Sequence, residues 1–319
     1  MLTVLLLEMP ATFTSAAAYT ARIRDSRYVR LSEWAKWQGL AVQWLKRGES
    51  LQLSRSGLRL QFTVDSREAS INGLQLWLLL PLAARGGDVY LSQLDIDATF
   101  NPLLSPPRNE KGKKVRVICL DAGHGGKDPG NHASGHHEKD YTLKLAQELR
   151  AQLGKAGFKV VMTRSGDSYP ELSDRPARAR RGGADVFLSL HFNATESSRA
   201  TARGSEVYAM TPVGAASTNA RGEGANAGAF PGNRWDEQNM LLAYQIQKAL
   251  LRQLGSEDRG VRRARFEVLR EATMPAALIE AGFLSHPTEG KKIFTAEYRR
   301  QMAKAIVEGV QAYKKIVER

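Results

Sequence analysis

The chain has 319 residues, of which 42% are hydrophobic and 25% are charged, so it can bury a full core and is long enough for two domains. The formal net charge is +13, and residues 1–110, with 12 basic and 10 acidic side chains, leave +11 for the rest. The only cysteine, Cys119, excludes an intrachain disulfide and a thiolate metal cluster, and its apolar surroundings predict a buried, inert thiol.

The first 20 residues have some features of a secretory signal peptide and lack others. Residues 2–7 are apolar and residues 15–18 (Ser-Ala-Ala-Ala) resemble a cleavage site, as in a secretory signal. No Lys or Arg precedes Arg22, however, and Glu8 interrupts the apolar region. We interpret residues 1–20 as a short or truncated signal peptide, with a plain N-terminal segment as the alternative. No other run reaches the roughly 20 apolar residues of a membrane span, so we expect no integral membrane segment.

Residues 21–104 predict a small β-rich α+β domain. A helix carrying Trp34 and Trp37 is expected near its start, and this domain contains no histidine. Segments rich in β formers follow between glycine-containing turns, at residues 43–45, 50–53, 58–64 and 74–80. Their order resembles the small domain at the N-terminus of copper amine oxidases, which also occurs as a detached module in many bacterial envelope proteins. No motif in it assigns a ligand.

Residues 105–114 form a predicted linker, because two prolines are followed by a charged, glycine-containing stretch. From residue 115 to 319, helices and strands alternate. The predicted helices are 141–156, 172–181, 237–254 and 297–316, and the predicted strands are 115–120, 158–163, 185–191, 206–210, 266–269 and 276–281. This alternation predicts an α/β fold with a mixed, largely parallel sheet flanked by helices.

Ionisable side chains follow three of these strands. The strand at 115–120 leads into a loop with four glycines around His124, and the strands at 185–190 and 276–279 are followed by His191 and Glu280. Glu138 opens the helix after the histidine loop. Open α/β sheets bind ligands beyond the carboxyl ends of their strands, so all four side chains can converge there. The loop glycines predict clearance for a bound substrate group.

Two histidines and a carboxylate are typical of a catalytic zinc site, and a further carboxylate is needed to move protons. The four residues His124, Glu138, His191 and Glu280 meet that requirement. Their gaps of 14, 53 and 89 residues contain no short metal-binding signature. From the residues alone, the alternative therefore stays open that each histidine is a satisfied polar group near a strand end.

Four segments together resemble the zinc-dependent N-acetylmuramoyl-L-alanine amidases of the amidase 3 family. They are residues 120–130 (LDAGHGGKDPG), 138–140 (EKD), 185–194 (DVFLSLHFNA) and 274–287 (MPAALIEAGFLSHP). The resemblance runs from about residue 114 to the C-terminus. It implies a zinc exopeptidase-like fold for residues 115–319 and a hydrolase that cuts the amide between N-acetylmuramic acid and L-alanine in peptidoglycan.

The same resemblance assigns roles to individual residues. His124, Glu138 and His191 are the expected zinc ligands, and Glu280 is the expected catalytic carboxylate, which passes the proton of a zinc-activated water to the leaving amine. Asp121 or Asn193 is expected to orient a ligand ring by a hydrogen bond, with a local loop-stabilising role as the alternative.

Several nearby residues have alternative interpretations. His137 could replace Glu138 as a ligand, although a surface role is favoured, and His286 is expected to be a turn residue. The basic helix at 172–181 either meets acidic stem peptides or is a solvated face. Residues 211–235 lack the apolar period of a helix, whereas some relatives carry an autoinhibitory helix there. We therefore expect an open site that needs no activating partner.

Three functional hypotheses remain: the amidase, a zinc peptidase of similar fold that cuts within peptides, and a non-catalytic wall-binding module. Retention of all four polar residues favours an enzyme. The basic charge fits an anionic wall polymer, and no aromatic-basic interleaving or recognition helix indicates nucleic acid as a partner. A bacterial cell-envelope location, periplasmic or secreted, follows from that substrate. A wall-binding role is the candidate for the N-terminal domain.

Overall fold

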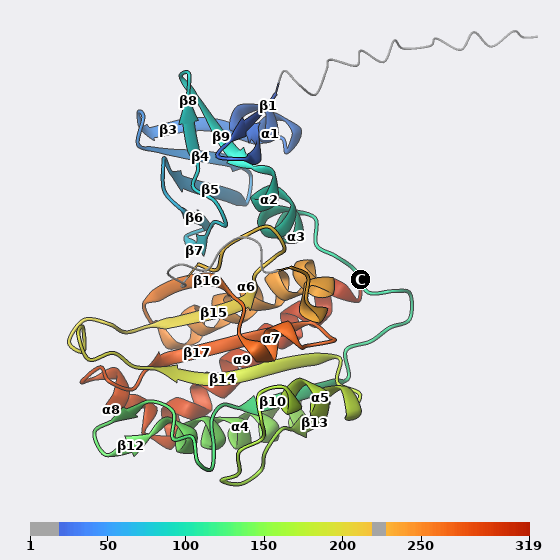
Figure 1. Cartoon of the computed structure of the whole chain (residues 1–319), viewed down its shortest axis with the longest axis vertical. Helices are drawn as coiled ribbons and strands as arrows, with labels where there is room; N and C mark the ends of the chain where they lie inside the picture. Colours follow the sequence, from blue (N-terminus) through green and yellow to red (C-terminus); the bar gives the residue numbers. More distant parts are fainter. Residues whose placement is uncertain (1–18, 219–227) are drawn as a thin grey trace, which may run out of the picture.

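The computed structural model describes residues 19–218 and 228–319, and in this part of the chain its main feature is an eleven-stranded sheet (Figure 1). From edge to edge, its strands are β13 (Lys159–Met162), β10 (Val117–Ala122), β14 (Val186–Asn193), β17 (Ala276–Phe283), β15 (Ser205–Met210), β16 (Asp258–Ala264), β7 (Leu74–Trp77), β6 (Glu68–Ile71), β5 (Leu58–Thr63), β4 (Ser50–Arg55) and β3 (Ala41–Lys46).

The half of the sheet formed after residue 115 is mixed. Strands β13, β10, β14 and β17 are parallel, β15 is antiparallel to β17, and β16 is parallel to β15. Both faces are covered: α4 (Glu138–Lys155), α6 (Asp236–Leu254) and α9 (Ala296–Val317) lie on one, and α5 (Asp174–Arg181) and α7 (Glu267–Arg270) on the other (Figure 1). The prediction of an α/β fold with a mixed sheet flanked by helices is therefore confirmed.

The N-terminal strands β3 to β7 form an antiparallel meander with one buried face. Leu51 and Leu53 of β4 are buried while Gln52 between them is not, as expected for a strand with one face on the core. The helix predicted around Trp34 is α1 (Leu31–Trp37). A separate four-stranded sheet lies beside it, with the order β1 (Thr20–Ile23), β2 (Ser26–Arg30), β9 (Asp88–Ser92) and β8 (Ala83–Arg85).

The two halves of the large sheet meet at β7 and β16. Leu76 pairs with Val261 in parallel, and the backbone N–H of Gln75 donates to the Asp258 carboxylate over 2.7 Å. Gly260 permits this approach, because a Cβ there would lie 2.8 Å from the carbonyl oxygen of Gln75. Continuous pairing thus joins the two predicted domains, although residues 105–114 form no helix or strand.

One predicted strand is wrong, and β16 is among the strands that were not predicted. Residues 266–269 belong to the short helix α7, which begins at Glu267, instead of a strand. Strand β16 escaped prediction because three of its seven residues are arginines. One of them, Arg263, is only 1% exposed and donates to the carbonyl oxygens of Met210 and Ala98. Although it is buried, an arginine does not contribute to the hydrophobic pattern from which a buried strand is predicted.

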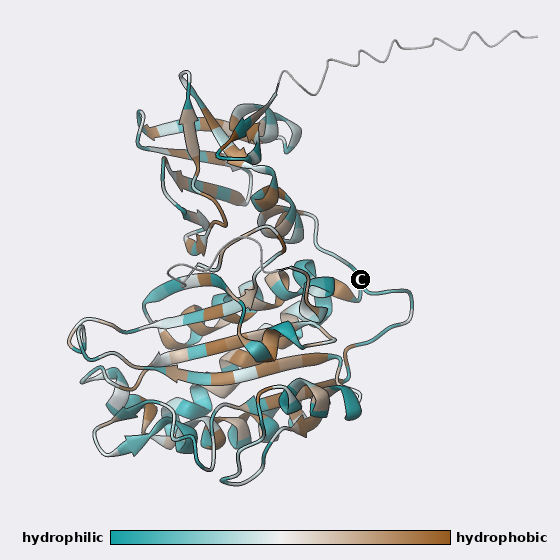
Figure 2. Ribbon diagram, viewed as in Figure 1, coloured by the Kyte–Doolittle hydropathy of each residue, from teal (hydrophilic) through white to brown (hydrophobic). Residues whose placement is uncertain are grey.

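The remaining described elements connect these layers. They are α2 (Gln93–Asp95), the π-helical turn η2 (Ile96–Phe100), α3 (Asn101–Leu104), β11 (His132–Ala133), β12 (His136–His137), the 3₁₀ turn η3 (Pro231–Trp235) and α8 (Glu289–Ile293). Figure 2 shows mainly hydrophobic segments along the strands of the sheet, interrupted by hydrophilic ones. Within residues 19–218 and 228–319, no helix is long and apolar enough to cross a membrane.

Candidate active site

Acidic and histidine side chains form a row across three neighbouring strands. His191 of β14 is the register partner of Glu280 of β17, which in turn is paired with Glu206 of β15. Side chains of directly paired residues project from the same face of a sheet. Strand β14 continues past His191, and β17 continues past Glu280 to Phe283. The site therefore lies on the face of the sheet, whereas the sequence predicts it beyond the strand ends.

Three of the predicted ligands converge. Donor atoms of His124, Glu138 and His191 all lie within 4.8 Å of one another. The Nε2 atom of His124 lies 3.1 Å from Glu138 Oε2, and the Nδ1 atom of His191 lies 3.0 Å from Glu138 Oε1. This geometry brings the three side chains together as predicted, although 14 and 53 residues separate them along the chain.

The carboxylate of Glu138 stands at the first residue of α4 and is 1% exposed. Burial alone would raise its pKa, but the hydrogen bonds and charges of His124 and His191 outweigh burial and hold the pKa well below its usual range. Backbone N–H groups of Phe192 and Asn131 also donate to it, at 3.0 and 2.9 Å. Glu138 is therefore an ionised, fixed carboxylate.

Two loop glycines make room for these side chains. A Cβ at Gly123 would lie 2.3 Å from the ring of His191, and one at Gly130 would lie 2.6 Å from the ring of His124. We had predicted that the loop glycines clear space for a substrate. At these two positions the clearance serves the histidine rings instead.

The hydrogen bond that orients the ring of His124 comes from Asp128. Its Oδ2 atom lies 2.7 Å from Nδ1 of His124, which leaves Nε2 directed toward Glu138. Burial opposes protonation of His124, but Glu138 and Asp128 together raise its pKa. The sequence analysis named Asp121 or Asn193 for this role, and the correction is that Asp121 bonds to other partners and Asn193 donates to Glu206. An aspartate four residues after the histidine was the signal overlooked.

Glu280 differs from every other carboxylate in the row. Its Oε2 atom is buried and has no hydrogen-bond partner among the described residues. Burial raises its pKa well above the usual range, and the charges of Glu138 and Glu206 raise it further. Glu206, by contrast, accepts from Asn193 at 2.9 Å and from Tyr208 at 2.9 Å. The unpaired carboxyl is thus the one suited to exchange a proton with a bound molecule.

These groups open into a cavity of about 360 Å³ on the face covered by α5 and α7. Its polar lining includes the three converging side chains and Glu280. Its apolar lining comes from Tyr169, Leu172, Phe266, Val268 and Leu278. An apolar lining with a few polar groups is typical of a site for a small group or a segment of a larger substrate.

Helix α5 is not simply the solvated basic face considered from sequence. Arg175 is 1% exposed and bonds to Asp121 at 3.0 Å, beneath the histidine loop. Arg178, one turn later, is partly exposed and pairs with Asp174 at 3.3 Å. The helix therefore has one buried arginine that belongs to the site and others at its surface.

The other histidines lie outside the cluster. His132 and His137 face each other across the β11–β12 hairpin, with ring centroids 5.1 Å apart, so His137 does not replace Glu138. His136 stacks on Phe294. The Nδ1 atom of His286 accepts from the backbone N–H of Glu289 at 3.2 Å, which is a local turn contact.

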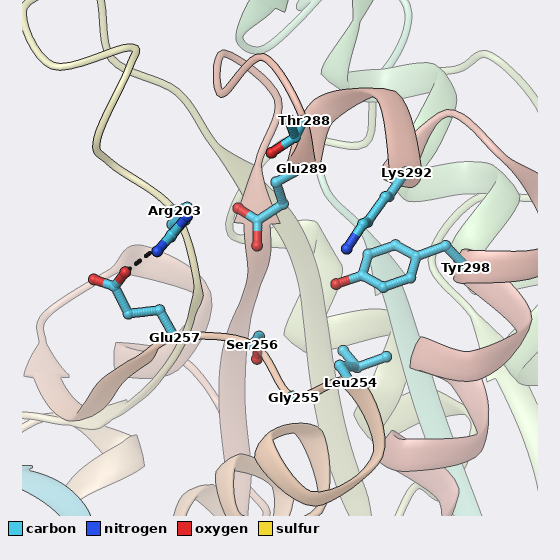
Figure 3. Close-up of a pocket in the computed structure, with 9 residues that line it drawn as sticks. All are labelled: Arg203, Leu254, Gly255, Ser256, Glu257, Thr288, Glu289, Lys292 and Tyr298. Carbon is cyan, nitrogen blue, oxygen red and sulfur yellow. Dashed lines mark hydrogen bonds and ion pairs between the residues drawn. The ribbon is translucent and has the colours of Figure 1, made fainter.

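A second cavity, of about 440 Å³, lies near the end of β17 (Figure 3). Arg203 and Glu257 pair at its edge, at 3.0 Å, and the Glu289 carboxylate is held by the backbone N–H groups of Gly204 and Phe283. Lys292 points into it. No histidine lines this cavity, and its acids are satisfied by donors, so it lacks the unpaired groups of the first one.

The segment between β15 and α6 is described only in part. Residues 211–218 contain no helix, and residues 231–235 form the short turn η3. Residues 219–227 lie outside the described part of the chain. The expectation that no autoinhibitory helix covers the site therefore stays a prediction.

Comparison with known proteins gives one family. The model of the family "N-acetylmuramoyl-L-alanine amidase" matches residues 118–312. The N-acetylmuramoyl-L-alanine amidase AmiC of Neisseria meningitidis is 37% identical over 69% of this chain and 57% of its own length. The probable cell wall amidase LytH of Staphylococcus saprophyticus is 34% identical over 70% of this chain and 64% of its own length. The chain thus spans less than two thirds of these two relatives.

Solved structures agree with this match. The N-acetylmuramoyl-L-alanine amidase from Clostridium difficile 630 has a TM-score of 0.53 at 35% identity, and covers 63% of this chain and 97% of its own. AmiC2 of Nostoc punctiforme has a TM-score of 0.53 at 30% identity, and covers 64% of this chain and 99% of its own. The likeness thus covers less than two thirds of this chain but nearly all of each solved domain.

Proposed function

The chain belongs to the family of N-acetylmuramoyl-L-alanine amidases, and from that premise we propose that it hydrolyses the amide between N-acetylmuramic acid and the first L-alanine of peptidoglycan stem peptides. One observation carries the proposal. A buried carboxyl with an unpaired oxygen, Glu280, lies beside a cluster of two histidines and a carboxylate in the same cavity.

The converging side chains fit a zinc ion. Two imidazoles and one carboxylate are a common catalytic zinc set with room for a further ligand, and Asp128 supports the His124 ring as a carboxylate partner usually does in such sites. We therefore propose His124, Glu138 and His191 as the ligands. A zinc ion held there supplies a Lewis acid that polarises the substrate carbonyl and lowers the pKa of water.

Glu280 is the proposed catalytic residue. Its unpaired Oε2 accepts the proton of the attacking water and then donates it to the nitrogen of the leaving L-alanine, so the C–N bond breaks with release of a neutral amine. Glu206 stays occupied by Asn193 and Tyr208, and its charge opposes ionisation of Glu280. A carboxyl with a raised pKa can carry out both transfers near neutral pH.

The apolar wall of the cavity suits the groups on either side of this amide. The lactyl carbon carries a methyl group, and L-alanine carries another, so Leu172, Phe266 and Val268 can bury them without an unmet polar group. Polar atoms of the substrate then face the histidines and Glu280.

We further propose that the protein acts in the bacterial cell envelope, periplasmic or secreted. Two relatives of this chain are named as wall or muramoyl amidases. The net charge of +13 favours an anionic wall polymer. We propose residues 21–104 as an accessory domain, 105–114 as a linker and 115–319 as the catalytic domain. A wall-binding role is proposed for the first.

The decisive experiment is digestion of purified peptidoglycan by the purified, zinc-supplied protein without any partner, followed by mass analysis. We expect glycan strands with free lactyl groups and intact stem peptides that begin at L-alanine. Shortened stems would indicate a peptidase, and retention on the wall without release would indicate a binding module. His124→Ala, assayed with its zinc content, is the control that links the products to the site.

A further inference from the structure

Three consecutive backbone carbonyl groups at the end of β10 are held by two buried guanidinium groups from elsewhere in the chain. The carbonyls belong to Ala122, Gly123 and His124, and the guanidinium groups to Arg164 and Arg175. The two arginines are 3% and 1% exposed. Neither residue touches the donor atoms of the proposed metal centre.

Arg164 joins two segments that each carry a proposed ligand. Its Nε donates to the carbonyl of Ala122 at 2.8 Å, and its Nη2 donates to that of Gly123 at 2.8 Å. The same Nη2 donates to the carbonyl of Lys139 at 2.8 Å, in the first turn of α4 beside Glu138. One planar group therefore sets the spacing between the His124 loop and the start of α4.

Arg175 fixes the other side of the loop. Its Nη1 donates to the carbonyl of Ala122 and its Nη2 to that of His124, both at 3.1 Å. Asp121 balances its charge at 3.0 Å and is itself held by Ser189 at 2.7 Å. The charge is thus paired inside the protein, which a buried guanidinium requires.

The loop needs such support because His124 has a φ of +61°, in the left-handed region that a residue with a side chain rarely adopts. Left alone, this residue would relax toward negative φ and turn its ring away from Glu138. Hydrogen bonds to the carbonyl groups on both sides of the residue oppose that relaxation.

We propose that Arg164 and Arg175 are positioning residues that hold His124 and Glu138 at metal-binding distance before any metal arrives. This inference rests on the proposed function, in which these two side chains are metal ligands. A fork of donors in one plane is needed to hold several carbonyls at once, and a lysine ammonium cannot reproduce it.

The test compares Arg164→Lys and Arg175→Lys with Arg178→Lys in the full chain. Arg178 is the matched control: it lies on the same helix as Arg175, pairs with an aspartate and donates to the Thr163 carbonyl, but does not contact residues 122–124. Zinc affinity of each metal-free protein is measured by competition with a chromophoric chelator. The visible spectrum of the Co²⁺-loaded protein reports ligand geometry, and kcat and KM follow.

We expect each of the two site variants to bind zinc about 10–100-fold more weakly, with a changed Co²⁺ spectrum and a lowered kcat at a KM within about twofold. Arg178→Lys should match wild type in all of these. Wild-type zinc affinity and spectrum in both Lys variants would overturn the inference. Wild-type protein that binds zinc but does not cut the wall would overturn the proposed reaction alone.

A milder variant covers the case in which a lysine variant does not fold. The Thr142 hydroxyl donates to the Gly123 carbonyl at 2.8 Å and accepts from Arg164 at 3.1 Å. Thr142→Val keeps the shape and removes both contacts. We expect a loss of zinc affinity of a few-fold in the same direction, and an unchanged affinity would count against the inference.

Discussion

The two halves of one continuous sheet are built differently. In the N-terminal strands β3 to β7, every buried side chain is hydrophobic. In the strands after residue 115, the interior also contains charged and hydroxyl groups, among them Asp121, Ser189 and Glu206. Burying such groups is costly unless they find partners. The strands after residue 115 therefore accept a cost that β3 to β7 avoid, and they do so where the cavity lies.

Two buried acids, Asp95 and Glu280, differ in whether their carboxylate oxygens have hydrogen-bond partners. Asp95, in the N-terminal half, accepts from the backbone N–H groups of Leu79 and Leu80 at 2.8 and 3.1 Å and from the Ser92 hydroxyl at 2.6 Å. Glu280 has an oxygen without a partner and two acids nearby. Burial raises the pKa of both. A raised pKa alone thus does not identify a site, whereas a raised pKa, a missing partner and a place in the cavity beside His124 and His191 together single out Glu280.

Metal removal should have the largest effect, and it should affect the site in the second half without unfolding the N-terminal half. Dialysis against a chelator is expected to reduce wall hydrolysis to background, because the proposed Lewis acid held by His124, Glu138 and His191 is lost. The N-terminal half contains no histidine and should keep its circular dichroism. Added zinc should restore activity. Full activity in protein shown to be metal-free would contradict the proposed mechanism.

Glu280→Gln is expected to have the next largest effect. General acid–base groups contribute about 10²–10⁴-fold to rate, and the glutamine can neither take nor return the proton. We expect kcat to fall by that factor while zinc content is unchanged. Glu68→Gln is the matched control, since it makes the same change at an exposed position of β6. Equal loss in the two variants would sink the assignment.

The sequence predicted well which side chains come together, because each follows an apolar strand or opens a helix with a clear pattern. It did not predict where on the sheet they lie. The predicted strand at 276–281 ends one residue after Glu280, yet Gly282 and Phe283 continue β17. Register between β14 and β17 puts His191 beside Glu280, and pairing between distant strands cannot be read from one strand alone.

Buried charges account for most of what was missed. Arg164 and Arg175 look like surface residues by type, and only the carbonyls they hold explain their burial. Arg263 concealed β16 in the same way, and with it the pairing to β7 that joins the two halves. The linker at 105–114 suggested separate domains. A linker-like composition indicates that residues 105–114 form no helix or strand, but it does not indicate whether strands on either side of the linker pair with each other.

Asp128→Asn should weaken the proposed metal centre without destroying it. An amide oxygen can still accept from Nδ1 of His124, but it lacks the charge that favours the required ring orientation. We expect zinc affinity to fall about 10-fold and thermal stability of the metal-free protein to change little. Affinity equal to wild type would show that the negative charge of Asp128 is not needed to orient the His124 ring.

Asp95→Asn should do the reverse, with an effect on stability and none on chemistry. The amide nitrogen would face a backbone N–H, which leaves a buried donor unsatisfied and costs about 1–3 kcal/mol. Urea unfolding measures the loss. The rate per folded molecule should equal that of wild type. A lowered kcat at full folding would mean that the N-terminal half also shapes the site, through the β7–β16 pairing.

The smallest expected effect concerns the edge of the sheet. Strand β3 is exposed along its whole length, and Trp44 is 39% exposed on it, on the same strand as Val42 and Leu45 at 43% and 50%. Large exposed apolar groups on an edge strand often mark a binding surface.

If the N-terminal half binds the wall, Trp44→Ala should weaken retention on insoluble wall by up to about 10-fold, the loss of one exposed aromatic anchor. Stability should change by less than about 0.5 kcal/mol, and hydrolysis of a soluble muramyl peptide should not change at all. Retention equal to wild type would remove Trp44 from any wall contact and leave the basic surface of residues 115–319 as the remaining candidate for attachment.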